Sequence, residues 1–269
     1  MNIDEIAKQL AGGLSLDQLR ERQNAAVQAA AKPKTQEQIA AECEYWNRVF
    51  AERPAKQEFF VTRQTNMEME YEDARRRFWA IMQMRAAHIA QLENNQEFQW
   101  EVDEPLAVII RSLVKYFIND KSGAYPLTKG LFIFGQNGTG KTEILTALAR
   151  FCEQYDLGKK FVFCSMSEVY NRARADKDYD PIEENQQFDR CFDEFGRNVG
   201  PVIRFGDPLD INEAIIEARY TRFRRYGQIT HFISNTTPNE AEARFSPMVF
   251  DRLRSMCTSV VFPGKSKRV

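Results

Sequence analysis

The chain has 269 residues, of which 43% are apolar and 28% are charged, and its formal net charge is −1. This composition is typical of a soluble globular protein that is large enough to bury a sizeable core. The balanced charge excludes a surface that is basic throughout, so a contact with nucleic acid would have to be local.

The N-terminus and the cysteines set further limits. The stretch MNIDEIAKQL is acidic and amphipathic, without the basic start and apolar core of a signal peptide, and no apolar run approaches the length of a membrane span. The five cysteines are scattered and contain no CxxC pair, which favours buried thiols in a reducing compartment over disulfides or a zinc site. We therefore expect a cytoplasmic protein without a membrane segment.

The first 120 residues predict a helical region. Two short amphipathic helices are expected within residues 1–30, and Pro33 belongs to a linker that ends them. A long charged helical segment follows from about Glu58 to Leu92, and apolar residues at helical spacing predict a further amphipathic helix over 106–117. We interpret residues 1–120 as a helical N-terminal region that interacts with a partner, because its helical and highly charged character suits a protein-interaction module. Nothing in its sequence identifies that partner.

Beyond residue 127 the pattern changes to alternating strands and helices. Helices are predicted between the strands, notably over Glu143–Tyr155 and Ile211–Tyr226. This alternation is typical of an α/β fold in which helices flank a parallel sheet. The predicted strands are LFIFG (131–135), KFVFCS (160–165), FDRCFD (188–193), THFISN (230–235) and TSVVF (258–262).

The stretch GQNGTGKT directly follows the first predicted strand and opens a predicted helix. It matches the P-loop pattern GxxxxGK[ST], and the alternative of a flexible surface loop does not explain the strand and the helix beside it. Glycines let backbone N–H groups converge on phosphate oxygens, while Lys141 reaches the β and γ phosphates and Thr142 offers its hydroxyl to Mg²⁺. The predicted nucleotide-binding residues are Gly135, Gln136, Asn137, Gly138, Thr139, Gly140, Lys141 and Thr142.

The third predicted strand ends in Phe-Asp-Glu. Asp193 is expected to hold Mg²⁺ together with Thr142, and Glu194 to orient or deprotonate an attacking water. The carboxyl edge of a parallel sheet, where this strand would deliver them, is where such folds bind ligands. Asp189 and Arg190 are unusual in a strand that should be buried, and they either pair with each other or lie near the strand's exposed start.

The fourth predicted strand ends in Ser234-Asn235. A polar residue at this position can hold the nucleophilic water against the γ-phosphate. The alternative is a turn-forming asparagine before Thr-Thr-Pro.

In this order, the segments GQNGTGKT, FDEFG, EARYTRF, THFISNTTPNE and FDRLRSMCTSVVFPGKSKR resemble the AAA+ ATPases of the bacterial helicase-loader group, DnaC/DnaI-like, and the related IstB family, over roughly residues 128–269. The resemblance implies a P-loop NTPase fold of AAA+ type over 121–269, ATP and Mg²⁺ as ligands, and ATP hydrolysis as the activity. It further implies a homo-oligomer with ATP bound between subunits, a replicative helicase as partner and single-stranded DNA as second ligand.

The resemblance also assigns roles to single residues. Asn235 matches the sensor 1 position, Arg252 matches the arginine finger that reaches the γ-phosphate of a neighbouring subunit, and Arg268 matches the sensor 2 position. The alternative for Arg252 is an ordinary surface ion pair on an amphipathic helix. Arg219 and Tyr220 match an Arg-Tyr pair that recurs in this group before sensor 1.

Two stretches interleave basic and aromatic residues in the way that suits single-stranded DNA, although each is equally well a solvated helix face. Their residues are Tyr170, Arg172 and Arg174 in the first, and Arg222, Arg224 and Arg225 in the second. Two other functions stay open, namely an IstB-like ATPase that assists a transposase and an ATP-binding scaffold with little turnover.

Overall fold

A computed structural model describes residues 41, 44, 69–92, 99–197, 200–204 and 207–264. The predictions for residues 1–30, for the Pro33 linker and for Arg268 lie outside these ranges. The elements, in chain order, are α4 (Tyr71–Leu92), α5 (Glu104–Phe117), β1 (Gly130–Phe134), α6 (Lys141–Gln154), β2 (Val162–Ser165), α7 (Met166–Ala175), a 3₁₀ turn (Glu183–Asn185), β3 (Arg190–Asp193), β4 (Val202–Arg204), β5 (Asp207–Leu209), α8 (Ile211–Tyr226), β6 (Thr230–Ser234), α9 (Pro238–Arg244), α10 (Pro247–Met256) and β7 (Cys257–Val261).

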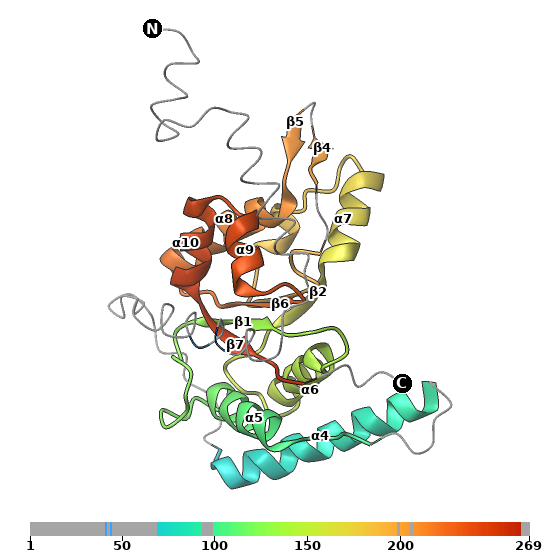
Figure 1. Ribbon diagram of the computed structural model, residues 1–269, viewed down its shortest axis with the longest axis vertical. Helices are drawn as coiled ribbons and strands as arrows, with labels where there is room; N and C mark the ends of the chain where they lie inside the picture. Colours follow the sequence, from blue (N-terminus) through green and yellow to red (C-terminus); the bar gives the residue numbers. More distant parts are fainter. Residues whose placement is uncertain are drawn as a thin grey trace, which may run out of the picture.

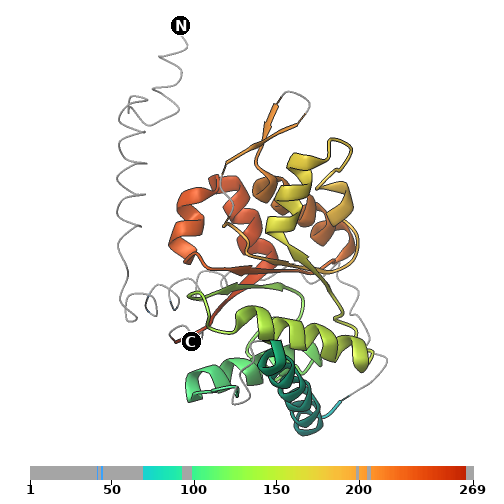
Figure 2. The ribbon, with the colours of Figure 1, turned by 90° about the vertical axis from the view of Figure 1, so that its right-hand side faces the viewer.

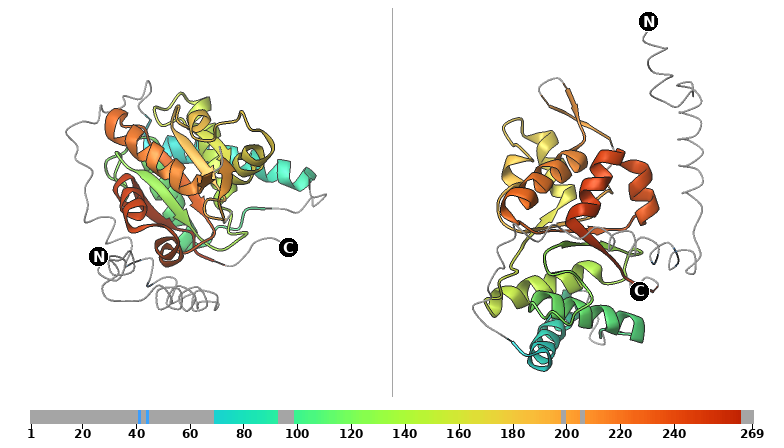
Figure 3. Two further views of the ribbon diagram at one scale, coloured as in Figure 1. Left: turned by 90° about the horizontal axis from the view of Figure 1, so that it is seen from above. Right: turned by 90° about the vertical axis from the view of Figure 1, so that its left-hand side faces the viewer.

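Five parallel strands form one sheet in the order β2-β3-β6-β1-β7. Helices α4, α5 and α6 cover one face and α7 to α10 cover the other, which gives three layers (Figures 1 and 2). The predicted fold class, a parallel sheet flanked by helices and preceded by helical segments, is confirmed, and all five predicted strands are present. The β4–β5 hairpin, which the sequence pattern did not predict, projects beyond α7 and α8 (Figures 1 and 3).

The central strands β1 and β6 are buried along their whole length. They read as nearly continuous apolar runs because a parallel strand with helices on both sides has no solvent face. Gly130 begins β1 where the two strands approach most closely, since a Cβ there would lie 1.8 Å from the carbonyl oxygen of Thr230. A side chain at this position would therefore push β1 and β6 apart.

Helices α4 and α5 pack into the same apolar core as α6. Phe78 of α4 contacts Phe151 of α6 edge to face, with ring centroids 5.9 Å apart. The Arg85 guanidinium donates to the Glu143 carboxylate in the first turn of α6, at 2.9 Å from its Nε. The described part of the N-terminal region is thus built onto the layer that carries the P-loop, while a domain boundary at residue 120 stays a prediction.

The two charged residues at the third strand lie at its start. Asp189 precedes β3 and is buried, and its carboxylate accepts a hydrogen bond of 2.9 Å from the Ile229 amide. Arg190 is the first residue of β3 and donates to the Glu184 carbonyl at 2.7 Å. Nearby, Arg219 is 1% exposed, and burial lowers its pKa to about 10 although Asp189 opposes the shift. Both residues thus lie at the start of the strand, as the second alternative has it, but the expected exposure is wrong for Asp189, which is buried.

Within the described ranges, no helix combines the length and the apolar composition that a membrane span requires.

His231 lies in β6 with its imidazole fully enclosed by aromatic rings of the α5 layer. Its ring centroid lies 6.0 Å from that of Tyr116 and 5.1 Å from that of Phe161, and its Nδ1 accepts a hydrogen bond of 3.2 Å from the Leu131 amide. Burial lowers the pKa of His231 to about 3, with Lys159 adding to the shift. Protonation would also remove the acceptor that the β1 backbone uses.

We predict that His231 makes folding stability depend on pH. A histidine whose folded pKa is depressed contributes stability that is complete above its unfolded pKa, near 6.5, and that is lost as the pH falls below that value. The free energy of unfolding, from urea titrations at pH 7.5 and 5.0, should fall by about 2 kcal/mol in the parent chain through this group. The variant His231→Gln should lack this loss, whereas His88→Gln, at an exposed position of α4, should retain it. An equal pH dependence in the parent and His231→Gln would contradict the prediction.

Candidate nucleotide-binding site

The glycine stretch forms the loop between the end of β1 and the start of α6. Gly138 and Gly140 have φ angles of 79° and 87°, in the left-handed region that favours glycine. Gly140 is the N-cap of α6 and therefore offers no side-chain hydrogen bond to the first turn of the helix. The amides of that turn remain suited to an anion, which is the arrangement of a phosphate-binding loop.

Lys141 is folded over this loop. Its side chain is buried, and its Nζ donates to the carbonyl oxygens of Gly135 at 2.9 Å and Gln136 at 2.8 Å. These contacts hold the ammonium group against the loop backbone. The predicted lysine therefore lies where it can compensate the charge of phosphates bound by the loop amides.

Thr142 and Asp193, the two predicted Mg²⁺ ligands, contact each other directly. The Thr142 hydroxyl donates to Asp193 Oδ2 at 2.9 Å, although the residues are 51 positions apart. Burial raises the pKa of Asp193, while hydrogen bonds from the Glu194 amide and from Thr142 oppose that shift. A hydroxyl and a half-buried carboxylate are oxygen ligands of the kind that Mg²⁺ prefers, so the residues present fit that ion.

Glu194 follows Asp193 and has a φ of 56°, which turns the chain sharply after β3. Its Oε2 accepts a hydrogen bond of 2.6 Å from the Ser167 hydroxyl, and its Oε1 forms an ion pair with Arg197. Both carboxylate oxygens thus have a partner that orients them, and each oxygen keeps a second lone pair that can accept a hydrogen bond from water.

Sequence reasoning missed both partners of Glu194. Ser167 lies in the first turn of α7, just after β2, and a polar residue beyond a parallel strand was the signal that could have marked it. Arg197 carries no comparable signal, because its role depends on the turn that Glu194 starts.

Asn235 lies at the same edge of the sheet. It is exposed and directly follows β6, which is hydrogen-bonded to β3 on one side and to β1 on the other. The P-loop, Asp193, Glu194 and Asn235 are thus brought together at the carboxyl ends of three neighbouring strands, as the sequence predicted.

Arg252 is not part of this group within one chain. It lies on α10, forms an ion pair with Glu217 of α8, and its guanidinium lies 5.7 Å from the ring centroid of Tyr220. Helices α8 and α10 cover the face of the sheet opposite α6 (Figure 1). The pair joins two helices and differs from the expected pairing along one helix. An action on a neighbouring subunit stays a prediction, as does the role of Arg268.

The two stretches considered for DNA contact both carry exposed arginines, Arg172 and Arg174 in the first, but their aromatic residues differ in exposure. Tyr170 is 1% exposed, and its hydroxyl accepts a hydrogen bond of 2.6 Å from Asn212, so the expectation that it stacks on bases is wrong. In the second stretch Arg224 and Arg225 are exposed beside Tyr226, which is 59% exposed. The end of α8 therefore stays a candidate surface.

No family model and no curated protein matches the chain. Among solved structures, a candidate primosome component from Streptococcus pyogenes serotype M3 is similar, with 15% identity over 62% of this chain and 84% of that chain and a TM-score of 0.48. DnaI is similar with 13% identity over 64% of this chain and 89% of its own, at a TM-score of 0.47. The DnaC helicase loader is similar with 15% identity over 61% of this chain and 94% of its own, at a TM-score of 0.42. These names agree with the resemblance found in the motifs, but at such values the similarities carry no functional argument, and the fold assignment rests on the sheet and the loop.

We predict that Lys141→Ala weakens the binding of Mg²⁺-ATP by roughly 10- to 100-fold, because hydrogen bonds to a charged group contribute about 1.5–3 kcal/mol each. Calorimetric titration of the full chain measures the affinity. Lys121→Ala, at an exposed position before β1, is the matched control and should bind like the parent. An unchanged affinity in Lys141→Ala would mean that the loop does not hold the nucleotide phosphates.

Proposed function

We propose that the chain is an ATPase of the helicase-loader type, which couples ATP binding and hydrolysis to the loading of a replicative helicase on single-stranded DNA. The observation that carries the ATPase part is the hydrogen bond of 2.9 Å between Thr142 and Asp193. It joins the residue that ends the P-loop motif to the acid that ends β3, which is the pairing that a Mg²⁺-nucleotide site requires.

In this proposal each residue has one task. Lys141 compensates the negative charge of the β and γ phosphates, and Thr142 and Asp193 hold Mg²⁺. An ion held by these two residues would supply polarisation of the phosphoryl oxygens. Glu194 accepts a proton from the attacking water on a lone pair that Ser167 and Arg197 leave free, and Asn235 orients that water at the edge of the sheet.

The helicase-loader part rests on the motifs of the C-terminal half and on the packing of α4. The segment from Phe250 to the C-terminus resembles the loader group, and it implies that Arg252 completes the site of a neighbouring subunit. Helix α4 contacts the first turn of α6 through Arg85 and Glu143. A partner bound to the N-terminal region would therefore lie on elements that are connected to the P-loop.

We expect Glu194→Gln to separate binding from chemistry. The amide keeps the shape but cannot take the proton, so kcat for phosphate release should fall by about 10²- to 10⁴-fold. The affinity for ATP should stay within about threefold, since the phosphate contacts are unchanged. Turnover close to that of the parent would place the base elsewhere.

The same variant is the bait for the partner. ATP-loaded Glu194→Gln protein, immobilised in extract of the native host, should retain a replicative helicase, while Lys141→Ala protein should not. Retention of a transposase in place of a helicase would contradict the loader assignment and support the IstB-like alternative.

A shared site predicts complementation between two inactive variants. Arg252→Ala and Lys141→Ala should each hydrolyse ATP poorly, but a mixture should regain part of the activity, because the first supplies an intact P-loop and the second an intact Arg252. Glu217→Gln, which removes only the ion-pair partner of Arg252, is the control and should stay active. A mixture that assembles, as judged by light scattering, yet shows no recovery would return Arg252 to a structural role on α10.

A further inference from the structure

The turn that carries Glu194 is held by its backbone. The Phe195 amide donates to the Ile233 carbonyl at 2.8 Å, and the Phe195 carbonyl accepts from the Ser234 hydroxyl at 2.8 Å. The Gly196 amide donates to Asn212 Oδ1 at 3.3 Å. The contacts come from β6 and α8, so the direction of the Glu194 side chain depends on elements outside its own strand.

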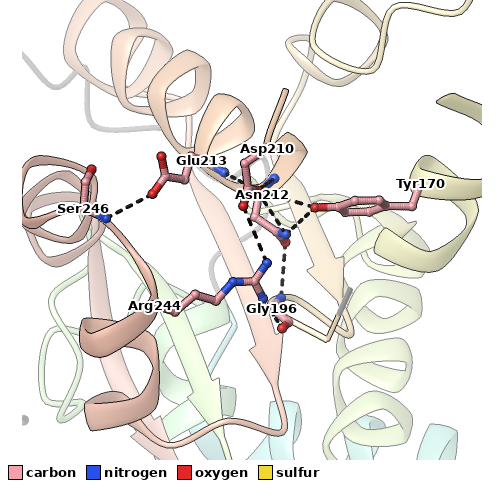
Figure 4. A network of polar contacts seen from close by, with 7 residues as sticks. All are labelled: Tyr170, Gly196, Asp210, Asn212, Glu213, Arg244 and Ser246. Atoms are coloured by element: carbon pink, nitrogen blue, oxygen red, sulfur yellow. Dashed lines mark hydrogen bonds and ion pairs between the residues drawn. The ribbon is translucent and has the colours of Figure 1, made fainter. Parts of the chain in front are cut away.

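Arg244, the last residue of α9, completes this set. Its Nη1 donates to the Gly196 carbonyl, and its Nη2 lies 3.8 Å from Asp210 Oδ2 (Figure 4). The Arg244 side chain is 17% exposed. Gly196 has a φ of 82°, and a Cβ there would lie 3.4 Å from Arg244 Nη1. The guanidinium is therefore fitted closely to a backbone conformation that glycine adopts without strain.

The contacts of Arg244 belong to a wider network that joins four helices. Asp210 caps the start of α8 by accepting from the amides of Asn212 and Glu213, and Asn212 donates to the hydroxyl of the buried Tyr170 on α7. Glu213 accepts from the Ser246 amide at the start of α10. Figure 4 shows Arg244 and Asn212 reaching the turn at Gly196, with Tyr170 and Asp210 behind them and the Glu213–Ser246 contact farther away. Asp210 thus holds one side of the Arg244 guanidinium, which directs its Nη1 donor at the Gly196 carbonyl.

We propose that Arg244 is a positioning residue for hydrolysis, which holds the Glu194–Gly196 turn in place and thereby sets the position of the Glu194 carboxylate. The inference rests on the proposed function, since it assigns Glu194 the role of base. Helix α9 begins three residues after Asn235, so Arg244 also connects the segment that follows β6 to the turn that follows β3.

The test is a double-mutant cycle in the full chain with steady-state phosphate release. Arg244→Met keeps the aliphatic stem and removes the donors, so kcat should fall by roughly 10- to 100-fold, because a misplacement of about 1 Å can cost about 10²-fold. The KM for ATP should stay within about threefold. Arg244→Lys should regain part of kcat, since one ammonium group can still donate to the Gly196 carbonyl. Arg150→Met, at an exposed position of α6, is the matched control and should leave kcat unchanged.

The background of Glu194→Gln separates positioning from a general loss of structure. If Arg244 acts through Glu194, Arg244→Met should change the residual turnover of Glu194→Gln by less than about twofold. An equal fall of kcat in both backgrounds, a fall explained by lost ATP binding, or no fall at all would overturn the inference. If Arg244→Met fails to fold, the cycle is measured with Arg244→Lys, and the same comparison applies.

A second readout does not depend on turnover. Hydrogen exchange of the Phe195 and Gly196 amides should be faster in Arg244→Met than in the parent and in Arg150→Met. A parent chain that does not hydrolyse ATP would refute the proposed function, and the exchange rates would still report on the turn. Unchanged exchange at these two amides would overturn the inference itself.

Discussion

The contact between Thr142 and Asp193 depends on the register of three parallel strands. Strand β6 lies between β1 and β3, and it pairs Ser234 with Phe134 on one side and Phe232 with Phe192 on the other. The three strands therefore end at nearly the same level, and a hydroxyl on α6 can reach a carboxylate that lies two strands away. A slip of β3 by one residue would turn the Asp193 side chain to the other face of the sheet.

This register explains why much of the site could be predicted from the sequence. Strands β3 and β6 end in Asp193 and Ser234, β1 is followed by the P-loop, and parallel strands collect such residues at one edge. The conformation of the loop from Gly135 to Thr142 is determined locally, because Gly138 and Gly140 adopt left-handed φ angles that glycine favours. Local chemistry and strand polarity were thus sufficient to place the P-loop, Asp193, Glu194 and Asn235 at one edge.

The remaining features depend on the three-dimensional path of the chain, through contacts between distant residues or within an irregular turn. The partners of Glu194 come from α7 and from its own turn, and Arg252 pairs with Glu217, which lies on another helix. Neither hydrophobic periodicity nor motif spacing contains that information. The hairpin of β4 and β5 has strands of three residues each, which is too short for an alternating pattern to stand out.

The packing of α4 has a mechanical consequence for the P-loop. Phe78, Ile81 and Met82 are at most 1% exposed, and burial of such side chains contributes about 1.5–3 kcal/mol each. Helix α4 is therefore firmly attached to α6, and the contact of Arg85 with Glu143 lies one residue from Thr142. Close-packed interiors transmit displacement between neighbours. Helix α4 and the first turn of α6, which carries Lys141 and Thr142, thus belong to one packed layer, and a substitution that loosens Phe78 or Arg85 would act close to the P-loop.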